Sequence, residues 1–260
     1  MNVTRISLLF GAGLAAGLMN AIAGGGTIVT FPALILAGIS SIDANATSTV
    51  ALLPGTLAGI VGYRSNLPAM RQWIRFFVPV SAFGGLLGGI LLTVTPTALF
   101  DRLVPFLILF ATALFTSHAL FVRIFRLKTI LAARDISSRG MTVALIFQFM
   151  VAVYGGYFGA GIGILMLASL AMMGFANIHE MNVVKGVIGF LINAVAAAYF
   201  ISVGLVDWAA AVVVALGSIA GGYSGAHFAQ KISQQTVRYL ITAVGLFITA
   251  IMFYKQFAKS

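Results

Sequence analysis

The chain contains the stretch Asn20-Ala-Ile-Ala-Gly-Gly-Gly-Thr27, followed by Phe31-Pro32, Gly38 and the polar run Asp-Ala-Asn-Ala-Thr-Ser-Thr at 43–49. Apolar residues surround this stretch on both sides, yet each of its consecutive glycines weakens a helix by about 1 kcal/mol relative to alanine. In a membrane span, a broken helix is tolerated only where protein or a water-filled cavity satisfies the freed backbone groups. We therefore expect this stretch to line a solute site inside the bilayer.

The composition indicates a helical membrane protein. Hydrophobic residues make up 61% of the 260 residues and charged residues only 8%, which is far from the balance of a soluble domain. The charges fall mostly in short breaks between apolar runs of roughly 18–25 residues, the length that crosses a bilayer core. A transmembrane barrel would show alternation in pieces of ~10 residues. We expect an all-α, polytopic membrane protein.

Charge and residue usage argue against several other functions. The net charge of +10 lies mainly in two arginine-rich segments, residues 64–75 and 123–139, which fits cytoplasmic anchoring better than nucleic-acid binding. The chain has no cysteine, and its three histidines and five acidic residues are scattered, so we expect no metal site. The glycine triplet lacks the lysine of a phosphate-binding loop, and nothing resembles a nucleophile–base pair. We expect no catalytic residues and no cofactor.

The apolar segments suggest that one unit occurs twice. They cover, approximately, residues 6–23, 27–38, 44–62, 74–94 and 99–122, and then residues 141–158, 162–174, 181–203, 209–228 and 237–257. We expect a first repeat over residues 1–122, a basic cytoplasmic linker over 123–140 and a second repeat over 141–260. If each broken pair folds back as a hairpin, the halves are inverted, whereas a single bent crossing makes them parallel. The inverted arrangement is favoured, with eight to ten membrane segments in total.

Aligned residues support the duplication. Gly24 and Gly26 align with Gly159 and Gly161 at one offset. At an offset two residues longer, the aligned pairs are Asn45 with Asn182, Thr56 with Asn193, Ser81 with Ser218, and glycines 84, 85 and 88 with glycines 221, 222 and 225. The alternative explanation is the small-residue composition that membrane helices share.

The two glycine breaks are the first candidates for a binding site. A helix that starts inside the membrane presents unpaired N–H groups and the positive end of its dipole, which attract an anion without any charged side chain. The triplet 24–26 precedes one short apolar segment, and Gly159-Ala160-Gly161 precedes another. The alternative role of these glycines is tight helix packing.

Polar side chains near the breaks are the second candidates. Lys185 lies in an apolar segment, where a lysine is costly unless it is paired or faces water, and it can attract an anion. It can equally be an interfacial lysine paired with Glu180. In the first half, Asn45, Thr47 and Ser48 can donate hydrogen bonds to an oxyanion or cap a helix. Proton carriers are scarce in mid-segment, which favours a carrier whose departing anion is driven by the membrane potential.

These residues resemble the sulfite exporter TauE/SafE family. The resemblance rests on the run 20–26 with Pro32, Gly38 and residues 44–48, and on Gly159-Ala-Gly-Ile-Gly163, Lys185, Asn193, Gly204, Asp207-Trp208 and glycines 217–225. It covers nearly the whole chain and implies an inner-membrane permease that moves sulfite, sulfoacetate or related organosulfur anions. The second break has alanine where the first has its middle glycine, so we expect the two half-sites to differ.

The sequence therefore predicts an inner-membrane transporter, and more specifically an exporter, of a small sulfur-containing anion that works by alternating access. The alternatives are an anion channel or uniporter, an uptake permease for an organosulfonate, and a non-transporting membrane enzyme or assembly factor. The expected partners are the anion and the lipid bilayer, without nucleic acid. A homodimer is compatible with the sequence, which fixes neither oligomeric state nor coupling ion. The residues expected around one midplane cavity are Asn20, Gly24, Gly25, Gly26, Thr27, Asn45, Thr47, Ser48, Gly159, Gly161, Asn182, Lys185 and Asn193.

Overall fold

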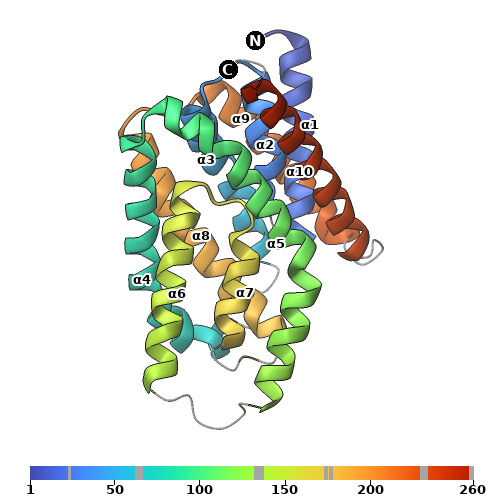
Figure 1. Cartoon of the computed structure of the whole chain (residues 1–260). Coiled ribbons are helices and arrows are strands. Elements are labelled where there is room, and N and C mark those ends of the chain that lie inside the picture. The colour runs from blue at the N-terminus through green and yellow to red at the C-terminus, as the bar shows by residue number, and fades with distance from the viewer. Residues whose placement is uncertain are drawn as a thin grey trace.

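The computed structural model describes residues 1–22, 25–61, 67–131, 138–172, 175, 178–228 and 234–257. Within these ranges the chain forms ten α-helices and no strand (Figure 1). The helices of the first half are α1 Val3–Ile22, α2 Thr27–Leu36, α3 Ser41–Val61, α4 Leu67–Val94 and α5 Thr97–Leu131. Those of the second half are α6 Ser138–Tyr157, α7 Ile162–Met172, α8 Ile178–Ser202, α9 Trp208–Phe228 and α10 Gln234–Phe257. The expected all-α fold class is confirmed.

Both predicted glycine breaks interrupt a helix. The first lies between α1 and α2 and the second between α6 and α7. Gly25 has a φ of +90° and Gly159 a φ of +76°, in the left-handed region that residues with a Cβ avoid. The short helices α2 and α7 have 10 and 11 residues. Each is therefore about 15 Å long, half the thickness of a bilayer core.

Each break folds the chain back as a hairpin. Helix α2 packs against α1, and α7 packs against α6, so the single bent crossing does not describe either pair. In Figure 1 the helix α1 begins at the upper end of the molecule and α6 begins at the lower end, so the two hairpins point in opposite directions. This arrangement is the one expected of inverted halves, while the duplication itself stays a prediction.

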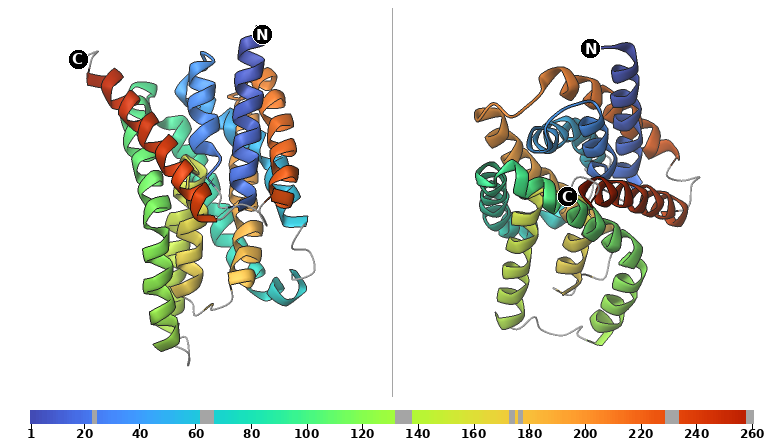
Figure 2. Two further views of the ribbon diagram at one scale, coloured as in Figure 1. Left: turned by 90° about the vertical axis from the view of Figure 1, so that its right-hand side faces the viewer. Right: turned by 45° about the horizontal axis from the view of Figure 1, so that its top comes forward.

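Helices of the two halves are interleaved. Helix α1 packs most extensively against α9, and α6 packs most extensively against α4. Likewise α3 packs against α9, and α8 packs against α4. Figure 2 shows α1 and α9 side by side. The first helix of each half therefore packs against the fourth helix of the other half: α1 against α9, and α6 against α4.

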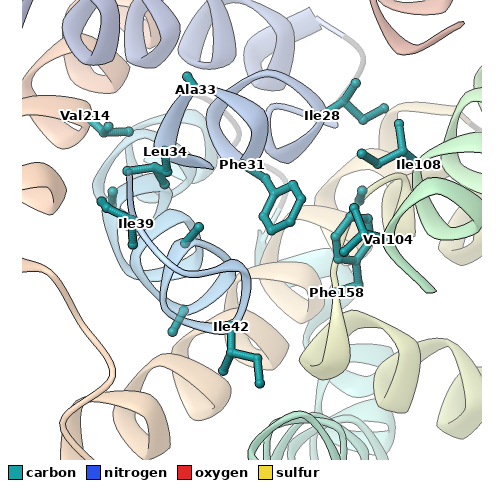
Figure 3. Close-up of a cluster of buried hydrophobic side chains, with 14 of the residues drawn as sticks. Ile28, Phe31, Ala33, Leu34, Ile39, Ile42, Val104, Ile108, Phe158 and Val214 are labelled. Carbon is teal, nitrogen blue, oxygen red and sulfur yellow. The ribbon is translucent and has the colours of Figure 1, made fainter. Parts of the chain in front are cut away.

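The short helix α2 provides much of the apolar core. Phe31 is fully buried and points toward Phe158, which follows the end of α6 (Figure 3). Their ring centroids are 5.4 Å apart in an edge-to-face arrangement, which stabilises an aromatic pair beyond simple burial. Phe100 of α5 completes the cluster, 6.4 Å from both rings. This cluster joins the two hairpins.

Several helices are suited to cross a membrane. Four are long and apolar enough by themselves, over Val3–Asn20, Leu67–Val94, Thr97–Leu114 and Glu180–Ser202. The shorter apolar stretches are Thr27–Leu36, Met141–Tyr157, Trp208–Ser224 and Thr242–Tyr254. The predicted multi-pass membrane location is therefore confirmed.

Two predicted segment boundaries are wrong. The sequence places basic loops at residues 64–75 and from residue 123 onward, but α4 already begins at Leu67 and α5 continues as helix to Leu131. Arginine, lysine and leucine are good helix formers, so a loss of hydropathy does not end the helix. Residues 132–137 of the predicted linker lie outside the described residues.

Candidate functional site: the two helix breaks

The first break is held by side chains of its own half. Asn20, near the end of α1, accepts a hydrogen bond from the backbone N–H of Gly26 at 2.8 Å. Thr30 of α2 donates from its hydroxyl to the Gly26 carbonyl at 3.2 Å, and the Ser48 hydroxyl lies 2.6 Å from the Thr30 hydroxyl. The bond from Gly26 to Asn20 satisfies one of the amides that would otherwise be free at the start of α2. Three of the predicted residues, Asn20, Gly26 and Ser48, thus form one connected group.

Two other predicted residues of this half lie on the same stretch of chain. Thr27 is the first residue of α2 and is half-buried. Gly25 supplies the left-handed turn, and Gly24 lies outside the described residues.

Asn45 and Thr47 of α3 bond to backbone groups of the second half. Asn45 is fully buried and donates from Nδ2 to the carbonyl of Tyr157, the last residue of α6, at 2.9 Å. The Thr47 hydroxyl accepts a hydrogen bond from the backbone N–H of Asp207 at 3.0 Å. Asp207 in turn accepts from the N–H of Ala210 at 2.9 Å and so caps the start of α9. Both predicted anion ligands therefore have structural partners.

The second break leaves backbone donors unused. Gly159 and Gly161 both have positive φ, +76° and +77°, and the Tyr154 hydroxyl donates to the carbonyl of Ala160 at 2.7 Å. The backbone N–H groups of Ala160, Gly161 and Gly163 donate no hydrogen bond to any described residue. They lie at the positive end of the α7 dipole, where a negative charge is stabilised.

Two polar side chains of α8 approach this helix start. A Cβ built on Gly159 would lie 3.6 Å from Asn193 Oδ1, and one built on Gly163 would lie 3.4 Å from Lys185 Cδ. Asn182 precedes Lys185 by about one helical turn, so the two side chains share a face of α8. Asn182, Lys185 and Asn193 are all half-buried. Among the described residues, the side chains of Asn182 and Asn193 have no hydrogen-bond partner.

The arrangement can therefore bind an oxyanion at the second break. Amide N–H groups, a carboxamide and an ammonium group are all hydrogen-bond donors, and the ammonium adds a positive charge. The first break offers less, because Asn20, Thr47 and Ser48 already bond to the protein. The two breaks are linked through the Asn45–Tyr157 hydrogen bond and the Phe31–Phe158 pair. One cavity shared by all the predicted residues stays a prediction.

Three polar residues at the breaks were missed by the sequence analysis: Thr30, Tyr154 and Tyr157. For all three a signal was available. Thr30 follows Thr27 by three residues on one helix, and Tyr154 and Tyr157 stand directly before the Gly159 break in an otherwise apolar segment. Hydroxyl groups beside a helix break are natural partners for freed carbonyls.

Two opposed, glycine-broken hairpins enclosed by long apolar helices define a multi-pass helical membrane protein of the kind that carries solutes. The chain belongs to the sulfite exporter TauE/SafE family, whose model matches residues 9–252.

Relatives in several bacteria are similar to it along nearly their full lengths. It is 27% identical to a "Probable membrane transporter protein" of Haemophilus influenzae, over 98% of this chain and 97% of the relative. It is 26% identical to "Probable membrane transporter protein ORF9" of a Sinorhizobium species, over 93% and 89%. It is 25% identical to "Probable membrane transporter protein YfcA" of Escherichia coli, over 96% and 90%. No solved structure matches the chain.

Proposed function

We propose that this protein exports a small sulfur-containing anion, such as sulfite or an organosulfonate, and that the anion binds at the start of α7. The observation that carries the proposal is the approach of Lys185 and Asn193 to a helix N-terminus with unused amides. The anion leaves the cell chemically unchanged. The membrane potential assists its exit by about 2.3 kcal/mol per charge for each 100 mV.

The proposal assigns different roles to the two breaks. Asn182, Lys185 and Asn193 donate to the anion together with the amides of residues 160–163. In the first half, Asn20 and Ser48 maintain the shape of the hairpin through their hydrogen bonds with Gly26 and Thr30. The second glycine motif has Ala160 where the first has Gly25, and this sequence difference fits the different roles of the two breaks.

Alternating access is supported by the opposed hairpins. Inverted halves give a transporter two related shapes, one open to each side, because exchanging the conformations of the halves reverses the opening. An anion channel would use the same donors along a continuous path. Uptake instead of export would use the same site with the opposite driving gradient.

A thermal-shift screen tests the binding site. Purified protein is heated with sulfite, sulfate, thiosulfate, sulfoacetate or taurine, because a ligand that binds the folded state raises its melting temperature. Lys185→Ala removes a charged donor worth about 1.5–3 kcal/mol, so sulfite affinity should fall roughly 10- to 150-fold. The control is Ser81→Ala, which removes only the hydrogen bond that Gln148 donates to Ser81 between α6 and α4. Equal effects of the two variants would overturn the assignment of Lys185.

Flux measurements in liposomes test the mechanism. A carrier shows saturable sulfite flux, and sulfite on one side accelerates movement of labelled sulfite from the other side. A channel gives flux without this counterflow, and that result would exclude alternating access.

A further inference from the structure

The backbone N–H of Gly161 is open, whereas the N–H that the predicted repeat aligns with it is capped. The same offset pairs Gly26 with Gly161 and Asn20 with Gly155. At the first break, Asn20 accepts the N–H of Gly26 at 2.8 Å. At the second break, Gly155 has no side chain, and the N–H of Gly161 donates to no described residue. The aligned amide is therefore closed in the first half and available to a ligand in the second.

Packing around Gly155 leaves no room for a capping side chain. A Cβ on Gly155 would lie 2.9 Å from Cγ2 of Ile192 and 3.3 Å from Cγ2 of Ile162. Even alanine would force the β-branched Ile192, whose χ1 is stiff, to shift within a packed interior. An asparagine that closed the Gly161 amide is therefore disfavoured at this position, and the surrounding helices keep the amide open.

Tyr154, near the end of α6, is fixed by its backbone and by its ring. Its carbonyl accepts the N–H of Phe158 at 2.9 Å and that of Gly159 at 3.1 Å, where the helix turns into the break. Its ring packs edge-to-face on Phe110 of α5, with the centroids 5.5 Å apart. The hydroxyl therefore has a defined position, from which it donates to the carbonyl of Ala160 at 2.7 Å.

This hydroxyl orients the N–H of Gly161 through the peptide bond that joins residues 160 and 161. A trans peptide is planar, and its C=O and N–H point in opposite directions. Because the Ala160 carbonyl faces the Tyr154 hydroxyl, the Gly161 N–H faces away from it. The flanking residues Gly159 and Gly161 have φ of +76° and +77°, and glycine adopts positive and negative φ about equally readily. Without the hydroxyl bond, the peptide between them is free to rotate.

We propose that Tyr154 is a positioning residue that holds the Gly161 N–H toward the anion at the start of α7. The proposal rests on the proposed function, and it adds the residue that organises the binding site. Lys185 and Asn193 approach the same helix start from α8, and the Gly161 N–H adds a third donor to theirs. A donor that is oriented before binding loses less conformational freedom when the anion arrives, which raises affinity.

A tyrosine-to-phenylalanine pair tests the positioning role. Tyr154→Phe removes the hydroxyl and keeps the ring on Phe110. The matched control is Tyr199→Phe, which removes the contact between the hydroxyls of Tyr199 in α8 and Thr93 in α4 at 3.1 Å. Sulfite is titrated calorimetrically into purified protein at a temperature where both variants are folded, so that the affinity reports on the site and not on global stability. We expect affinity to fall about tenfold in Tyr154→Phe and to stay within about twofold in Tyr199→Phe.

Nuclear magnetic resonance gives a second readout, part of which needs no sulfite. Protein labelled with carbonyl-¹³C alanine and ¹⁵N glycine reports on the peptide between Ala160 and Gly161, and Ala160→Ser assigns its signal by removing it. Without ligand, Tyr154→Phe should shift the Ala160 carbonyl resonance upfield, because the carbonyl loses its hydrogen bond, and Tyr199→Phe should leave it in place. Added sulfite should shift the Gly161 amide resonance in the wild type and in Tyr199→Phe, and far less in Tyr154→Phe.

These measurements separate the positioning role from the choice of substrate. Equal sulfite affinities of the two variants would overturn the proposal and leave Tyr154 as a structural residue. An Ala160 carbonyl signal unchanged in Tyr154→Phe, or a Gly161 amide signal that bound sulfite does not shift, would also overturn it. If the carbonyl signal moves as expected and the wild type binds no sulfite, the proposed substrate is wrong, whereas the control of this peptide by Tyr154 stands.

Discussion

Substitutions of Asn20 test whether the anion binds at the first helix break or at the second. Its Oδ1 atom accepts the N–H of Gly26, a buried residue, at 2.8 Å. Asn20→Leu removes the acceptor and leaves a buried amide unpaired, at a cost of about 1–3 kcal/mol. For a chain of this size each kcal/mol corresponds to about 2–4 °C, so the melting temperature should fall by roughly 2–12 °C. The measurement is thermal unfolding of purified protein without ligand.

Asn20→Asp keeps the acceptor and adds a charge. A carboxylate is favourable at the start of a helix by about 0.3–1 kcal/mol, so the melting temperature should be preserved. An anion bound at the first break would lie about 5 Å away and be repelled by about 3 kcal/mol at an effective dielectric constant of ~20. Its affinity would fall roughly 200-fold. An anion bound at the start of α7 should lose far less.

Sulfite titration of the Asn20→Asp variant therefore decides between the breaks. A loss of about two orders of magnitude in affinity would refute binding at the start of α7. An unchanged melting temperature for Asn20→Leu would refute the capping role of Asn20.

Three further substitutions, two of them paired with a control variant, test the packing. Thr47→Val leaves the N–H of Asp207 without its acceptor and should cost about 1–3 kcal/mol in thermal unfolding, whereas Thr47→Ser should restore stability. Gly17→Ala should lower the melting temperature because its Cβ meets the α9 backbone, whereas Gly11→Ala on the same helix meets nothing within 4 Å and should raise stability by up to about 1 kcal/mol. Ser48→Ala removes the hydroxyl beside Thr30 and should cost about 1 kcal/mol without changing sulfite affinity.

The helix breaks were predictable, because glycine runs weaken a helix wherever they occur. The end of α5 was not predictable from hydropathy. Hydropathy shows where the apolar residues stop, whereas the helix continues through polar residues to Leu131. The sequence did not decide whether α1 and α2 form a hairpin or a single bent crossing, because the two arrangements differ only in long-range packing. The contacts between α1 and α2 show the hairpin.

The partners of the polar side chains were beyond sequence reasoning. An asparagine in an apolar segment can face a solute or a neighbouring carbonyl, and the residue type is the same in both cases. Asn45 donates to Tyr157, 112 positions along the chain, whereas Asn182, with which the predicted repeat aligns it, has no hydrogen-bond partner among the described residues. Local patterns identify where polar groups are unusual, and only the packed fold determines which of them bond to protein.

The chain starts and finishes on one side of the molecule: α1 begins and α10 ends at the same end in Figure 1, while α5 ends and α6 begins at the other. A reporter domain fused to either terminus therefore samples the same compartment, and a reporter inserted between α5 and α6 samples the opposite one. Because the arginine-rich segments favour the cytoplasm, alkaline phosphatase should be active at both ends of the chain, and a green fluorescent protein should fluoresce only at the internal position.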